Sequence, residues 1–234
     1  MNAGHPRCHE CSVRQTALCA SMLDDELEAL SAIGRRKLFP GGQVVTWSGD
    51  PNTLCANVVS GALKVTASTE DGREQIVGLL YQGDFAGQPF VEEAPLTITA
   101  LTDTDLCLFP RPAFERTLGA YPRLERLLLQ RTMRSLDDAR QRMLSLGRKN
   151  AQERIAGFLL DVIERTVPRG APMPLSIELP IGRGEMADFL GLTIETVSRQ
   201  LTRLKSDGVI AFEKGDRSCT IVNRAALEAI AYPL

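Results

Sequence analysis

Residues 185–201 read EMADFLGLTIETVSRQL, and the order of small and apolar residues in this stretch predicts two helices joined by a tight turn. Ala187 is small where two crossing helices would touch, and Gly191 can adopt the backbone angles that the turn needs. Val197 supplies a β-branched apolar anchor on the second helix. Thr193 suits the N-cap of that helix because its hydroxyl oxygen can accept an amide hydrogen. The stretch therefore has the pattern of a helix-turn-helix.

The second helix of this motif carries a polar face that suits the reading of DNA bases. Arginine can grip guanine bidentately, glutamate can accept from cytosine, and serine can meet a base or a phosphate. These polar residues recur at helical spacing, away from Ile194, Val197 and Leu201; they are Glu195, Ser198, Arg199 and Arg203. The alternative is a solvated face with a Glu195–Arg199 pair. The spacing of the motif and the hairpin expected after it favour double-stranded DNA as a partner.

The flanking residues extend this motif into a winged helix-turn-helix domain over residues 148–234. An apolar face predicts a helix before the motif, and β-branched runs around Gly215 and Asp216 predict a hairpin after it. The expected elements are a helix at 150–166, a strand at 175–179 and a hairpin made of 209–212 and 220–222.

A long helix is expected over residues 121–147, with a break at Gly147. One stripe of it is apolar, and its members are Leu129, Met133, Leu136 and Met143. Such a stripe suits either packing within its own domain or pairing with a second copy as a homodimer. Asp137 and Asp138 follow Leu136. Across a two-fold axis they would repel each other unless they were compensated; alternatively, they lie on the solvated outer face.

Residues 23–120 have the pattern of an antiparallel β-roll or jelly roll. Short β-rich runs such as 44–47 and 62–66 alternate with turns that contain glycine, for example Gly61 and Gly72. A short helix with acidic residues in its first turn is expected at 24–30. The predicted fold class is therefore α+β: an N-terminal β-roll, a long helix and a C-terminal winged helix-turn-helix.

The cysteines are concentrated at the N-terminus, in residues 1–22. The chain has six cysteines, and Cys8, Cys11 and Cys19 follow a Cys-x2-Cys-x7-Cys spacing. This is not the pattern of a secreted disulfide scaffold, whereas three thiolates on one short segment suit metal binding or redox sensing. Cys55 and Cys219 have no cysteine at a comparable spacing and are expected to be structural.

Composition limits the other classes of function. The N-terminus has no apolar signal segment and no run is long enough to span a membrane, so a cytoplasmic protein without a membrane partner is expected. The net charge of −2 makes the DNA prediction depend on the motif rather than on charge. Both histidines lie in the first nine residues, and no phosphate loop or Gly-x-Ser-x-Gly motif is present, so an enzyme is not expected.

Taken in order along the chain, these elements resemble the catabolite-activator and fumarate-and-nitrate-reduction regulator superfamily (CRP/FNR). The stretch from Arg183 to Arg199 is especially similar to the oxygen-responsive FNR branch. The resemblance implies a homodimeric transcription regulator that reads TTGAT-type inverted repeats through Glu195, Ser198 and Arg199 and that works with RNA polymerase. It also places the paired long helices at the dimer interface.

The same resemblance implies an oxygen-labile [4Fe–4S] cluster as the cofactor. Cys107 occupies the position where FNR-type sensors carry their fourth cysteine, and the implied ligands are Cys8, Cys11, Cys19 and Cys107. Relatives that bind cyclic nucleotides hold the phosphate with an arginine, and the corresponding stretches 83–90 and 94–100 contain none, so no cyclic nucleotide is expected. The alternative on the same fold is a zinc site, with His5 and His9 near the cysteine pair, or a thiol-redox switch.

Overall fold

The computed structural model describes residues 8, 10–167, 170–212 and 217–233. The chain divides into two compact units, residues 1–137 and residues 138–234. No helix in the described part of the chain is long and apolar enough to cross a membrane.

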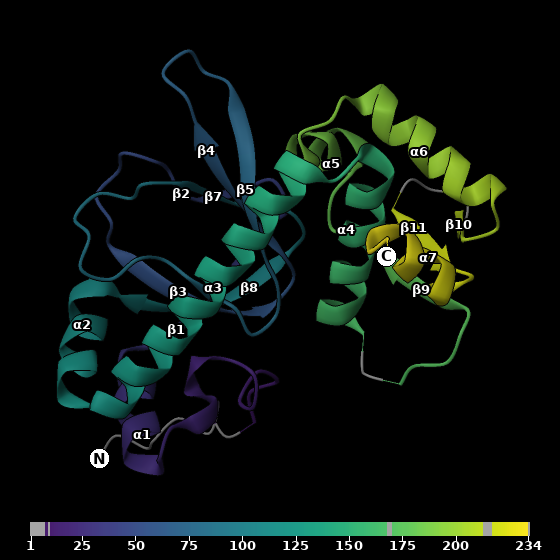
Figure 1. Ribbon diagram of the computed structural model, residues 1–234. Helices are drawn as coiled ribbons and strands as arrows, with labels where there is room; N and C mark the ends of the chain where they lie inside the picture. Colours follow the sequence, from purple (N-terminus) through teal and green to yellow (C-terminus); the bar gives the residue numbers. More distant parts are fainter. Residues whose placement is uncertain (1–7, 9, 168–169, 213–216, 234) are drawn as a thin grey trace. The chain divides into compact units, whose positions relative to one another are not determined.

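The first unit is the β-roll that the sequence predicts (Figure 1). It consists of two four-stranded antiparallel sheets with the strand orders β1-β8-β3-β6 and β2-β7-β4-β5. Their bounds are β1 Arg35–Phe39, β2 Val44–Thr46, β3 Leu54–Ser60, β4 Leu63–Ser68, β5 Glu74–Leu80, β6 Phe85–Ala86, β7 Thr97–Ala100 and β8 Thr104–Pro110. The helical elements before and after the strands are η1 Leu18–Ser21, α1 Asp24–Ile33 and α2 Arg111–Ala120.

Strand β8 separates two hydrophobic cores because its side chains alternate between the two faces of the sheet. Leu106 and Leu108 point into the core that also contains Val58 and Leu63 from β3 and β4. Cys107 and Phe109 belong to the opposite core, which is shared by the cysteine-rich segment and helices α1 and α2. This alternation places the Cys107 thiol on the face of the sheet that the N-terminal segment covers.

Helix α3 spans Pro122–Arg148, where the sequence predicts a helix over 121–147. The helix includes Gly147, whose absent side chain would meet no atom within 4 Å, and ends one residue after it. The chain turns only afterwards, where Asn150 caps the next helix by accepting from the amides of Gln152 at 3.0 Å and Glu153 at 3.1 Å. The break between α3 and the next helix therefore falls at Lys149 and Asn150.

The second unit is a winged helix-turn-helix. Its three-stranded antiparallel sheet has the order β10-β11-β9, and the Gly215-Asp216 turn expected between β10 and β11 lies outside the described residues. The element bounds are α4 Ala151–Thr166, β9 Leu175–Glu178, α5 Arg183–Leu190, α6 Ile194–Ser206, β10 Ile210–Phe212, β11 Ser218–Ile221 and α7 Arg224–Ala231. The C-terminal helix α7, which packs on α4, and helix α2 were not predicted from the sequence.

Candidate cysteine centre and DNA-reading helix

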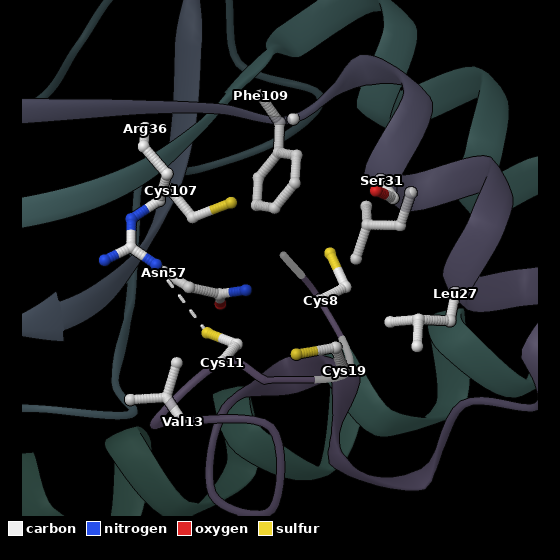
Figure 2. Close-up of a pocket in the computed structure, with 12 residues that line it drawn as sticks. Cys8, Cys11, Val13, Cys19, Leu27, Ser31, Arg36, Asn57, Cys107 and Phe109 are labelled. Carbon is white, nitrogen blue, oxygen red and sulfur yellow. Dashed lines mark hydrogen bonds between the residues drawn. The ribbon is translucent and has the colours of Figure 1, made fainter. Parts of the chain in front are cut away.

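Four cysteine side chains meet at one cavity of about 70 Å³ in the first unit. They are Cys8, Cys11, Cys19 and Cys107, the four that the sequence analysis singled out. Figure 2 shows their sulfur atoms turned toward the same space. The remaining lining residues come mainly from α1 and the sheet: Val13, Leu27, Leu30, Ser31, Gly34, Arg36, Asn57 and Phe109.

The N-terminal segment reaches this geometry through short-range turns rather than through a long helix. The amide of Cys11 donates to the carbonyl of Cys8 at 3.4 Å, and the amide of Arg14 donates to the carbonyl of Cys11 at 2.9 Å. The Arg14 guanidinium then folds back onto the carbonyl oxygens of Cys19 and Met22. These bonds curl the segment so that three cysteines separated in sequence face one point.

Buried anchors hold the curled segment against the β-roll. Val13, Ala17 and Leu18 are each about 1% exposed and join the core formed by α1 and α2. Arg131 on α3 donates to the carbonyl of Thr16 and, at 2.9 Å, to the carbonyl of Gly83. The segment is therefore fixed both by apolar packing and by a cation from α3.

The backbone beside Cys107 is closely packed. A side chain at Gly34, between α1 and β1, would lie 3.1 Å from the Phe109 ring and 3.4 Å from the Cys107 sulfur. A larger residue at this position would require the Phe109 ring to shift by a few tenths of an ångström, so glycine suits this close approach of α1 to the sheet. The approach brings the apolar residues of α1 over the cavity.

Burial controls the ionisation of the sheet cysteine. It raises the pKa of Cys107 to about 12, with a further upward effect from Cys8 and an opposing one from Arg36. The pKa of Cys19 is raised for the same first reason, and next by Cys11. Each of these two thiols has its pKa raised by other cysteines of the cavity, because their sulfur atoms lie close together. A bound metal would reverse this tendency because it takes its cysteine ligands as thiolates.

The residues present fit a polynuclear iron–sulfur group. Four thiolates are the usual donor set of such clusters, and zinc accepts the same donors. The size of the cavity distinguishes the two groups. About 10–15 Å³ already accommodates one water molecule, so this cavity has room for several atoms and not only for one zinc ion. Among the described residues, no three His, Cys, Asp or Glu side chains stand close enough to hold a single metal ion. The zinc alternative also called on His5 and His9, which lie outside the described residues.

The two other cysteines stand apart from this cavity. Cys55 on β3 is 1% exposed within the core, and Cys219 on β11 is completely buried in the second unit. Burial raises the pKa of each thiol to about 12. Their environments are those of small core residues, as the sequence analysis expects.

The helix-turn-helix prediction is confirmed in its backbone details. Gly191 ends α5 in the left-handed region at φ 62°, and Thr193 caps α6 by accepting from the Thr196 amide at 3.3 Å. Val197 and Leu201 are buried. Ile194, which the sequence analysis groups with these two residues on the apolar side of the helix, is 48% exposed, because it occupies the first position of α6 and only its tip approaches Gly184.

The polar face of α6 is accessible. Glu195, Arg199 and Arg203 are exposed, and Ser198 is half-buried between them. Hydrogen bonds to its own backbone amide and to Thr193 lower the pKa of Glu195, so this residue is a carboxylate that can accept from a base. Arg203 also lies 3.9 Å from Asp207 one helical turn later. The four predicted base-reading residues therefore share one helix, α6.

The apolar stripe of α3 is exposed in the single chain. Leu129 is 56% exposed, Met133 50%, Leu136 41% and Met143 69%. Asp138 beside this stripe is paired: the Arg165 guanidinium donates to its carboxylate at 3.1 Å. An exposed apolar stripe of this size on one helix is the pattern of an interaction surface.

Sequence reasoning missed several residues of the cysteine centre. Arg36, Asn57 and Gly34 line the cavity, and Arg131 holds the segment that carries three of the cysteines. No local motif marks them, because strand register and helix docking bring them to the site. Arg36 follows Gly34 by two positions, and this spacing alone does not indicate a metal site.

A β-roll with a cysteine-lined cavity, followed by a winged helix-turn-helix, defines a DNA-binding regulator. Two family models match the chain: a Crp-like helix-turn-helix domain over residues 153–230 and a cyclic nucleotide-binding domain over residues 36–121. The chain belongs to the CRP/FNR superfamily of transcription regulators, and this family consists of regulators rather than enzymes.

Several named relatives align over nearly the full length. The transcriptional activator protein FnrL of Cereibacter sphaeroides is 43% identical over 224 residues, covering 94% of this chain and 90% of the relative. The fumarate and nitrate reduction regulatory protein of Salmonella typhi is 32% identical over 227 residues, covering 96% and 90%. The structure of FixK2 from Bradyrhizobium japonicum superimposes with a TM-score of 0.78 at 31% identity, covering 86% and 99%. The chain is thus of the transcriptional activator type.

Proposed function

We propose that this activator responds to oxygen through a [4Fe–4S] cluster held by Cys8, Cys11, Cys19 and Cys107. The observation that carries the proposal is the convergence of these four side chains on one cavity. The cavity is large enough for several atoms, and apolar residues of α1 and β8 form part of its wall. The cluster supplies a centre that dioxygen can oxidise, and the chain supplies the four thiolates.

The response reaches the helix of the apolar stripe through the cysteine-rich segment. Cluster binding fixes this segment against β8, and Arg131 on α3 holds the same segment at Thr16. Pairing of two chains along Leu129, Met133, Leu136 and Met143 then gives a homodimer with two copies of α6. A two-fold dimer matches an inverted repeat, and we expect half-sites of the TTGAT type read by Glu195, Ser198 and Arg199, with Arg203 on the same helix.

This proposed function also implies a cellular location, a protein partner and the absence of a nucleotide ligand. An oxygen-labile cluster and DNA both call for the cytoplasm, and an activator acts through RNA polymerase. The β-roll belongs to a nucleotide-binding domain family, but stretches 83–90 and 94–100 offer no arginine for a cyclic phosphate, so the cluster takes the place of that ligand.

Metal analysis of anaerobically purified protein tests the proposal. We expect about four iron and about four acid-labile sulfide per chain, because one cluster takes one full set of four thiolates. Cys107→Ser should abolish the cluster, whereas Cys55→Ser, a change at a core cysteine outside the cavity, should retain it. One zinc per chain without sulfide would establish the zinc site instead. A metal-free protein whose DNA binding follows thiol oxidation would establish a redox switch.

A further inference from the structure

Three cavity-lining residues form a row across one face of the sheet. In the strand register Arg36 on β1 lies opposite Cys107 on β8, and Asn57 on β3 lies opposite Cys107 from the other side. Directly opposed residues project to the same face of a sheet, and all three line the cavity (Figure 2). The sheet cysteine is thus flanked by two side chains that can donate N–H groups.

Arg36 is held so that one edge of its guanidinium faces the cysteines. Its Nε donates to Asp105 Oδ1 at 3.0 Å, and its Nη2 donates to the other oxygen of the same carboxylate. The remaining Nη1 lies 3.7 Å from the Cys11 sulfur, within hydrogen-bonding range for sulfur. A bidentate pair of this kind fixes the direction of the third nitrogen.

Asn57 is buried without a full set of hydrogen bonds. The residue is 2% exposed, and its side-chain oxygen has no partner among the described residues. Figure 2 shows its amide beside the cysteines, turned into the cavity. In Figure 2 the amide nitrogen points into the space between the cysteines. Cluster sulfurs are acceptors, so this nitrogen can donate to them. The unpaired oxygen is itself an acceptor, gains nothing from the cluster and makes the buried amide costly to the fold.

We propose that Arg36 and Asn57 are the hydrogen-bond donors that tune the bound cluster, one on each side of Cys107. The proposal rests on the cluster function proposed above. Donors to cluster sulfurs stabilise the form with more electrons, so they raise the reduction potential. When dioxygen oxidises the cluster, the electrons that the cluster loses reduce dioxygen. Both residues therefore slow cluster loss in air, and they set the oxygen level at which the regulator responds.

Asn57→Leu is the sharper test because the two side chains have similar size. We expect the cluster of this variant to have a lower reduction potential and to bleach roughly tenfold faster in air-saturated buffer. The metal-free variant should melt at a higher temperature than the metal-free wild type, because an unpaired buried amide is removed. A residue with a purely structural role would instead lower the melting temperature.

Arg36→Gln should shift potential and bleaching rate in the same direction, and so should Asp105→Asn, which releases the guanidinium. Arg35→Gln is the matched control: Arg35 precedes Arg36 on β1, is exposed, and projects from the other face of the strand. Circular dichroism shows whether Arg36→Gln folds. If it does not, the potential and the bleaching rate of Arg36→Lys are measured instead, since lysine keeps the charge but cannot form the bidentate pair with Asp105.

The outcomes separate this inference from the proposed function. A wild-type protein without iron and sulfide would refute the cluster itself. A wild-type cluster together with unchanged potentials and lifetimes in Asn57→Leu and in the Arg36 variant would refute the donor role while leaving the cluster intact. A folded variant that assembles less cluster than the Arg35→Gln control supports the inference, because the donors then help to hold the group.

Discussion

Arg131 on α3 donates from Nη1 to the carbonyl oxygen of Gly83 at 2.9 Å, and its second terminal nitrogen donates to the carbonyl of Thr16. Gly83 adopts φ 90°, and a side chain there would lie 2.9 Å from the Thr16 hydroxyl. One guanidinium therefore joins the cysteine-rich segment, a turn of the β-roll and the long helix. Burial lowers the pKa of Arg131 somewhat, but an arginine remains charged at neutral pH.

Arg131→Met should loosen the cysteine-rich segment. The variant keeps the apolar stem but loses two charge-assisted hydrogen bonds, so we expect the free energy of unfolding to fall by about 2 kcal/mol. Hydrogen exchange of residues 10–21 should accelerate. Arg134→Met, at an exposed position one turn along α3, is the control for urea denaturation and exchange. Equal effects of the two variants would remove the link between α3 and the segment.

A charge in the apolar stripe of α3 should prevent pairing. Leu136→Glu places a carboxylate at the seam, and we expect the dimer dissociation constant to rise by at least about tenfold, equivalent to ~1.4 kcal/mol. Gln141→Glu adds the same charge at an exposed position off the stripe and should leave association unchanged. Sedimentation velocity of the anaerobic protein measures both. A Leu136→Glu dimer of wild-type affinity would place the interface elsewhere.

Removing Asp138 should have little influence on association. Arg165 already compensates its charge at 3.1 Å, so Asp138→Ala removes an exposed ion pair worth roughly 0–1 kcal/mol. We expect wild-type sedimentation in both atmospheres and a slightly lower free energy of unfolding. If Asp138→Ala forms a dimer in air while the wild type does not, this carboxylate opposes pairing in spite of Arg165.

Arg199→Ala should weaken binding to the specific site by ~1–3 kcal/mol, because one bidentate guanine contact is lost. Affinity for random DNA should change much less. Competition titrations at fixed salt with an inverted-repeat TTGAT duplex and a scrambled duplex separate the two effects. An equal loss on both duplexes would mean that Arg199 contacts phosphate.

Two glycines of the second unit should respond oppositely to alanine. Gly191 has φ 62°, and its added methyl group would lie 3.2 Å from Leu146, so Gly191→Ala should lower the free energy of unfolding by about 1–2 kcal/mol. Gly147 lies within α3 with open space around it, so Gly147→Ala should raise it by ~0.5–1 kcal/mol. Chemical denaturation measures both. A stabilising Gly191→Ala would contradict the left-handed turn.

The sequence predicted the order of the main elements because their signals are local. A capping threonine, a turn glycine and alternating apolar residues act within a few positions, and the helix-turn-helix around Gly191 followed from them. The cysteine set was predicted from spacing and family resemblance. Its surroundings were not, because Arg36 and Asn57 reach Cys107 only through the register of three strands. The end of α3 was placed within one residue, at Gly147 instead of Arg148, because a glycine near a helix end is also a local signal.

The four cysteines that line the cavity come from two stretches that lie far apart along the chain, the N-terminal segment and β8. A group bound by Cys19 and Cys107 together therefore closes a loop that contains nearly the whole β-roll. Such a closure acts on the unfolded chain as a cross-link does, by reducing its conformational entropy. The effect depends only logarithmically on loop length, so lengthening the exposed turn around Gly72 would scarcely alter it. Cofactor binding at this place is thus also a constraint on the topology of the unfolded polypeptide.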